Sequence, residues 1–126
     1  MILDTSVLVA GARGWLEESA LADEDDVALP AVVVAEYLAG VLLDDDPARR
    51  AAFLADVLEV TPVCDYSQAV AERHATLLAH VRRAGEQRGA HNLLIAATAC
   101  ATARTLLTCD SRARFDQLPG VSARVV

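Results

Sequence analysis

Residues 1–10 read MILDTSVLVA, and this stretch determines the fold expected of the chain. Met1–Leu3 is a short apolar run of the kind that forms a strand, and Ser6–Ala12 has the composition of a buried helix. Asp4 stands between them, and Asp is a favoured residue at the start of a helix. The opening therefore predicts a buried strand that turns directly into a helix, with a carboxylate at the junction.

Further short apolar runs alternate with longer helix-like segments. The other expected strands are Val27–Leu29, Val60–Val63, Thr105–Thr108 and Val121–Val126. The expected helices are Trp15–Ala22 (a turn or two), Pro30–Leu43, Pro47–Glu59, a helix from Asp65 or Ser67 to Arg83, and Ala90–Ala103. This alternation predicts an α/β fold with a mostly parallel central sheet of about five strands and helices on both faces. A chain of 126 residues fits a single domain over 1–126.

Charge is distributed unevenly along the chain. The net charge is −7, with −10 in residues 1–63 and +3 in residues 64–126, and all 11 basic residues are Arg. The total argues weakly against nucleic-acid binding, but the second half has enough arginine to form a basic surface. Arg82, Arg83 and Arg88 are candidates for contacts with RNA phosphates or with acidic residues of a protein partner. A solvated helix end is the alternative for the same residues.

The sequence favours a cytoplasmic protein. No apolar run approaches the ~18–20 residues needed to span a bilayer, so we expect no membrane association. The first residues lack the basic segment of a signal peptide. The three cysteines are widely spaced and form no C-x-x-C motif, which argues against a disulfide framework and against a zinc site.

Two aspartates directly follow expected strands. Asp4 follows Met1–Leu3, and Asp110 follows the run that ends at Cys109. Ligands of open parallel sheets bind at the carboxyl ends of the strands, so both side chains are expected at the edge where a site would form. A helix-capping role is the alternative for each aspartate.

Two further polar side chains lie in apolar helices. Glu36 has only apolar or small neighbours one helical turn away, and an ionised Glu in such a place needs an Arg partner, a shifted pKa or a metal cation. Asn92 lies in the first turn of the Ala90–Ala103 helix, where an N-terminal hydrogen bond is the alternative role. Carboxylates gathered in one pocket repel unless a cation is present, and oxygen donors suit Mg²⁺, or Mn²⁺ as its substitute. Such a centre is suited to phosphodiester hydrolysis.

Four stretches resemble the motifs of one family in the right order along the whole chain. They are MILDTSVLVA, PAVVVAEYLAG, RGAHNLLIAATA and LLTCDSRARFDQLPGV, and together they resemble PIN-domain ribonucleases, specifically the VapC-type toxins of bacterial VapBC toxin–antitoxin systems. The resemblance implies a PIN-like fold and endonucleolytic cleavage of RNA. It also implies a VapB-type antitoxin as partner and a homodimer.

Carried over by position, the resemblance assigns Asp4, Glu36 and Asp110 to an acidic quartet that binds Mg²⁺ or Mn²⁺ and is catalytic. Thr5, Ser6 and Thr108 are the candidates for a supporting hydroxyl. The fourth acidic position is occupied by Asn92, where the family has Asp. An amide offers one carbonyl oxygen and no charge, so we expect metal affinity or turnover to fall by about tenfold or more while the fold survives.

Asn92 leaves two functions open. One is a weakened or inactive metal-dependent ribonuclease, and the other is a catalytically impaired PIN-fold module that binds RNA or protein. The sequence does not show whether Asn92 is natural or engineered, and it does not identify the RNA or the number of metal ions. Other phosphate enzymes fit poorly, because the chain has no G-x-x-x-x-G-K-[ST] motif and no Lys for a haloacid dehalogenase-like or receiver site. A G-x-S-x-G nucleophile motif is also missing.

Overall fold

A parallel sheet forms the centre of the computed structural model, which describes residues 1–21 and 26–126. The strands pair in the order β1-β4-β5 and β2-β3, and every pair is parallel. A bridge between Ile2 and Ala28 joins the two groups, which gives the continuous order β3-β2-β1-β4-β5. The strands are β1 (Ile2–Leu3), β2 (Leu29–Pro30), β3 (Val63–Cys64), β4 (Leu106–Thr108) and β5 (Ala123–Val125).

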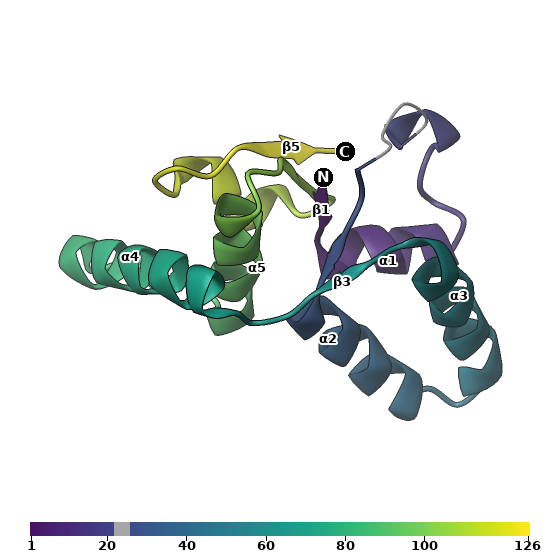
Figure 1. The fold of residues 1–126 in the computed structure, drawn as a ribbon. Coiled ribbons are helices and arrows are strands. Elements are labelled where there is room, and N and C mark those ends of the chain that lie inside the picture. The colour runs from purple at the N-terminus through teal and green to yellow at the C-terminus, as the bar shows by residue number, and fades with distance from the viewer. Residues whose placement is uncertain (22–25) are drawn as a thin grey trace.

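Helices cover both faces of this sheet. The helices are α1 (Thr5–Ala12), α2 (Ala31–Leu42), α3 (Pro47–Val60), α4 (Gln68–Ala84) and α5 (Ala90–Ala101), with 3₁₀ turns η1 (Glu18–Ala20), η2 (Ser111–Ala113) and η3 (Phe115–Gln117). In Figure 1, α4 and α5 lie on one side of β1, while α1 and α3 lie on the other. Helix α1 packs against β4 and α2, and α5 packs against β1, β2 and α4. The predicted α/β class and mostly parallel sheet are confirmed.

Several predicted boundaries are wrong. The expected strand Val60–Val63 is displaced, because α3 continues to Val60 and pairing begins at Val63. Thr61 is extended, as is usual for the residue before a proline, so the helix ends there. Pro30 caps α2 instead of lying in its first turn, and the expected helix Trp15–Ala22 contains only the turn η1. Its last residue, Ala22, lies outside the described residues.

The core is built from aliphatic side chains of the central strands and the helices that cover them. Ile2, Leu106 and Leu107 are fully buried on the paired strands β1 and β4. Tyr37 is also buried, and its hydroxyl donates to the Arg50 carbonyl at 3.1 Å. Trp15 is 69% exposed and carries the Arg13 guanidinium over its ring. The two aromatic residues therefore have different environments, one in the core and one on the surface.

Within the described ranges, no helix combines the length and the apolar character that crossing a membrane requires.

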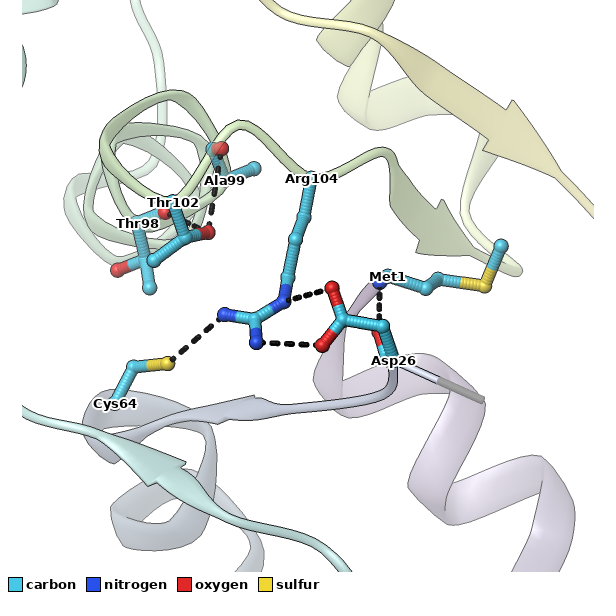
Figure 2. Close-up of polar contacts among 7 residues, drawn as sticks. All are labelled: Met1, Asp26, Cys64, Thr98, Ala99, Thr102 and Arg104. Atoms are coloured by element: carbon cyan, nitrogen blue, oxygen red, sulfur yellow. Dashed lines mark hydrogen bonds and ion pairs between the residues drawn. The ribbon is translucent and has the colours of Figure 1, made fainter. Parts of the chain in front are cut away.

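Arg104 joins the segment before β4 to the segment before β2 and to β3 (Figure 2). Arg104 donates to both carboxylate oxygens of Asp26, at 3.0 and 2.7 Å, and its remaining amino group lies 3.7 Å from the Cys64 sulfur. The ammonium group of Met1 donates to the Asp26 carbonyl. These contacts hold the start of β1 and the segment before β2 in place. The Arg104 hydrogen bonds and charge keep the pKa of Asp26 below its ordinary value.

This pair makes stability depend on pH. Because the pKa of Asp26 is lowered by folding, its contribution is present above its unfolded value, near 3.8, and is lost as the pH falls through the folded value. We expect Asp26→Asn to lower the thermal unfolding midpoint at neutral pH and to have little effect at strongly acidic pH. Thermal scans across this range test the pair, with Asp56→Asn on α3 as control. A deficit that stays constant with pH would contradict it.

Candidate active site

Asp4 lies at the carboxyl end of β1, inside the sheet. It is only 6% exposed, and its backbone N–H donates to the Leu107 carbonyl of β4 at 2.9 Å. One carboxylate oxygen accepts from the Thr5 N–H at 2.8 Å, so Asp4 caps α1, which was the alternative role that the sequence allowed. A capping role leaves the other oxygen, Oδ2, available for different contacts.

Two hydroxyl groups converge on Asp4 Oδ2. The Thr108 hydroxyl donates at 2.7 Å and the Ser6 hydroxyl at 2.9 Å, while the two hydroxyl oxygens lie 3.3 Å apart. Ser6 Oγ also accepts from the Cys109 N–H, and Thr108 Oγ1 accepts from the Asp110 N–H. Parallel pairing of β1 with β4 makes this possible, because it places residues about a hundred positions apart at one edge. The network fixes the Asp4 carboxylate relative to the backbone of Asp110.

Glu36 reaches the same edge from α2. Its Oε1 accepts from the Thr5 hydroxyl at 3.0 Å, and its Oε2 lies 3.4 Å from His91 Nδ1 on α5. The Arg partner considered from sequence is therefore replaced by Thr5 and His91. Sequence reasoning missed His91, although its position beside Asn92 in the first turn of a helix was an available signal. Thr5, Ser6 and Thr108, the three candidate hydroxyls, each contact an acidic side chain of the site.

Asn92 is the third residue of α5 and directly follows His91, whose ring lies against Glu36. Its side-chain amide packs on Gly89, where an added Cβ would lie 3.4 Å from the Asn92 nitrogen. Gly89 caps α5 without any side-chain hydrogen bond, so Asn92 is not the N-cap. Across residues 1–21 and 26–126, the Asn92 amide takes part in no hydrogen bond within the protein. The amide is thus not committed to an internal role.

Asp110 follows β4 and is more open than Asp4. Its side chain is 46% exposed, caps η2 by accepting from the Arg112 N–H at 3.0 Å, and lies 3.9 Å from the Arg112 guanidinium. The preceding residue, Cys109, has a half-buried thiol. Burial, followed by the charge of Asp4, raises the pKa of this thiol and so favours its protonated form.

The three candidate arginines are placed differently from one another. Arg82 and Arg83 are exposed in the last turn of α4. Arg88 departs from the expectation of a surface contact, because its side chain is only 5% exposed. Its Nη1 donates to the carbonyls of Ala113 and Arg114 at 2.6 and 3.0 Å. Its guanidinium is therefore occupied by contacts within the protein.

The acidic side chains do not form a compact cluster of three. Within the described residues, no group of three or more His, Cys, Asp or Glu side chains is arranged to hold a metal ion. The donor types nevertheless suit a hard cation, since the candidate residues supply three carboxylates, one amide oxygen at Asn92 and three hydroxyls. Asn92 is the uncharged member of the four candidate metal ligands. The residues present therefore fit Mg²⁺ or Mn²⁺ in donor chemistry, with one anionic ligand missing.

Comparison with known proteins places this site in a family. A PIN domain model matches residues 1–121. The chain belongs to the PIN domain family. A comparison with curated protein sequences finds no significant match.

Solved structures similar to this PIN domain include members of toxin–antitoxin systems. A VapBC-5 structure from Mycobacterium tuberculosis is 30% identical, with a TM-score of 0.82 over 99% of this chain and 97% of that chain. FitAcB from Neisseria gonorrhoeae is 26% identical, with a TM-score of 0.78 over 97% and 94% of the two chains. VapBC2 from Rickettsia felis, bound to a promoter DNA fragment, is 22% identical and shares the fold, with a TM-score of 0.89 over 99% and 97%. The resemblance to VapC-type PIN domains is confirmed.

Proposed function

We propose that this PIN domain is a Mg²⁺- or Mn²⁺-dependent endoribonuclease of a toxin–antitoxin pair, weakened by Asn92. The observation that carries the proposal is the environment of Asp4. Asp4 is 6% exposed, and its carboxylate is oriented by three hydrogen bonds and has no cationic side chain paired with it in the described part of the chain. A buried carboxylate held in one orientation beside Asp110 and Glu36 is suited to binding a divalent cation.

Asp4, Asp110, Glu36 and Asn92 are the residues that would hold Mg²⁺ or Mn²⁺. When bound, such an ion activates a water molecule and neutralises charge that develops on a phosphate. The protein's own contribution is orientation. Ser6 and Thr108 fix the Asp4 carboxylate, so it does not need to reorganise when substrate binds. Thr5 holds Glu36 at 3.0 Å and so keeps it on the same edge of the sheet.

The proposed partners follow from the relatives. The VapBC-5 structure is described as a member of the VapBC family of toxin–antitoxin systems, and we extend this to a VapB-type antitoxin for the present chain. RNA is the proposed substrate, and a homodimer in the cytoplasm is the proposed state. Exposed Arg82, Arg83 and Arg112 can contribute positive charge to a partner or substrate surface.

A second candidate function is a binding module without catalysis. It is favoured by Asn92 and by the lack of a three-acid cluster among the described residues. In that case the same fold would hold RNA or a protein partner without cleaving RNA. Restoring the acid at position 92 separates the two functions, because a binding module gains no activity from it.

The test is cleavage of total cellular RNA with Mg²⁺ or Mn²⁺ by three proteins. These are the chain as it stands, Asn92→Asp, and Asn92→Asp combined with Asp4→Asn. We expect Asn92→Asp to cut RNA at least about tenfold faster than the chain as it stands, and Asp4→Asn to abolish the gain. EDTA should stop cleavage. A folded Asn92→Asp protein that cuts no RNA with Mn²⁺ would favour the binding module.

A further inference from the structure

A cavity of about 280 Å³ opens beside the candidate active site. It lies between the η2–η3 segment and β5, and two of its lining residues, Thr108 and Asp110, belong to the site already described. The wall on the far side is made by the segment that follows Asp110. The polar lining residues of this wall are Ser111, Arg114 and Asp116. The cavity is thus continuous with the proposed catalytic edge and has its own polar lining.

Arg88 holds this wall in place through hydrogen bonds to its backbone. Its side chain is 5% exposed, and its guanidinium pairs with Glu86 at 3.1 Å and donates to two consecutive carbonyls of the wall, those of Ala113 and Arg114. A buried cation is costly unless it is paired and hydrogen-bonded. The hydrogen bonds that Arg88 makes here stabilise one conformation of a surface segment. Arg88 immediately precedes the turn of Gly89 and the start of α5. It therefore joins the segment around Asn92 to the segment around Asp110.

Arg114 is held in a strained conformation by this arrangement. Its φ is +48°, in the left-handed region that residues other than Gly rarely adopt. Strain of this kind persists where surrounding contacts impose it, and it is frequent at binding sites. The Arg114 guanidinium makes no hydrogen bond or ion pair with the part of the chain that the structure describes, and the residue is exposed at the rim of the cavity. A fixed backbone thus presents an uncommitted cation next to Asp110.

We propose that this cavity is the subsite for the RNA nucleotide next to the cleaved phosphodiester, with Arg114 as its phosphate contact and Arg88 as the positioning residue of its wall. The inference rests on the proposed function. A guanidinium binds phosphate oxygens, and the Ser111 hydroxyl and Asp116 carboxylate match the hydroxyls of a ribose or the donors of a base. The volume accommodates a single nucleoside. RNA is favoured over an acidic peptide because the cavity shares Thr108 and Asp110 with the proposed catalytic edge, where the phosphodiester of a substrate would have to lie.

The first test is Arg114→Gly. Glycine adopts φ near +48° without strain, so this variant removes the guanidinium while the fold is retained or stabilised. Binding of a labelled, random-sequence single-stranded RNA pool is measured with the Asn92 chain in Ca²⁺ and in Mn²⁺. We expect affinity to fall about tenfold and the salt dependence of log K to weaken by about 0.7, which is the contribution of one phosphate contact. Arg73→Ala on α4 is the charge-matched control and should change neither quantity.

Arg88 is tested through its coupling to Arg114. Arg88→Lys keeps the charge but cannot donate from a planar fork, so it should lose part of the RNA affinity, and Arg88→Ala should lose more. If Arg88 acts through Arg114, then Arg88→Ala should cause little further loss of RNA affinity in a protein that already carries Arg114→Gly. If Arg88→Ala instead lowers affinity by destabilising the fold, the two losses should add fully. Thermal unfolding of each variant confirms folding.

The outcomes separate the subsite from the function. If the parent protein binds the RNA pool and Arg114→Gly binds equally well with the same salt dependence, the cavity is not an RNA subsite. A protein partner then becomes the better candidate for it. If the folded parent protein binds no RNA in either ion, the proposed function fails and the subsite fails with it. Additive effects of Arg88→Ala and Arg114→Gly on RNA affinity would overturn the positioning role of Arg88.

Discussion

Asn92→Asp is expected to bind Mn²⁺ at least about tenfold more tightly than the chain as it stands. The amide of Asn92 has one carbonyl oxygen to offer and no charge, whereas a carboxylate offers two oxygens and an anion. The substitution is nearly isosteric, and the Asn92 side chain has no hydrogen bond to lose within the described residues. Isothermal titration calorimetry with Mn²⁺ measures the change directly, without depending on an RNA substrate.

The control for this prediction is Asp45→Asn, which removes an exposed carboxylate between α2 and α3, remote in sequence from the site. It should leave the tight Mn²⁺ site unchanged, because it affects only weak ion binding to an acidic surface. Equal Mn²⁺ affinity for Asn92→Asp and for the parent protein would show that position 92 does not contribute to a metal site.

Thr108→Val is expected to lower the free energy of unfolding by about 1–3 kcal/mol. The Thr108 hydroxyl is buried, donates to Asp4 Oδ2 at 2.7 Å and accepts from the Asp110 N–H at 3.0 Å. Valine preserves the shape of the side chain but leaves both partners without this hydrogen bond in a buried place. Chemical denaturation of both proteins measures the difference. The same substitution should also loosen Asp4 and weaken Mn²⁺ binding by Asn92→Asp.

Thr98→Val is the matched control for Thr108→Val. Thr98 is also buried, but its hydroxyl donates only to the Leu94 carbonyl of its own helix, at 2.8 Å. That carbonyl retains its helical hydrogen bond after the substitution, so the loss should be clearly smaller. Similar losses in the free energy of unfolding for the two variants would mean that the Thr108 hydrogen bonds stabilise the fold no more than an ordinary hydrogen bond within a helix.

Much of the architecture could be predicted from the sequence. Short apolar runs separated by amphipathic or apolar helices specify a parallel sheet, and Asp4 and Asp110 were placed at one edge because parallel strands end on the same side. The three hydroxyls were expected only through the resemblance to PIN domains, and each lies against an acidic side chain in the structure. These features depend on strand direction and register, which the alternation of the pattern determines.

Other features depend on side-chain packing that no local pattern records. Arg88 resembles any exposed basic residue of a polar loop, and only the left-handed backbone at Arg114 places two carbonyls within its reach. The pairing of Glu36 with His91 depends on how α2 and α5 pack together. The end of α3 was misplaced because valine suits both helix and strand, and the decisive residue was Pro62.

Whether the edge of the sheet around Asp4 binds a divalent cation is tested most directly by locating Mn²⁺ in crystals of Asn92→Asp by anomalous scattering. We expect one strong peak in contact with the carboxylates of Asp4 and Asp110 and with the restored acid at position 92. The peak should disappear when Asp4→Asn is added. If crystals grown in saturating Mn²⁺ show no peak at this edge of the sheet, or show Mn²⁺ only on the exposed Asp44–Asp46 run, then these residues do not form a metal site.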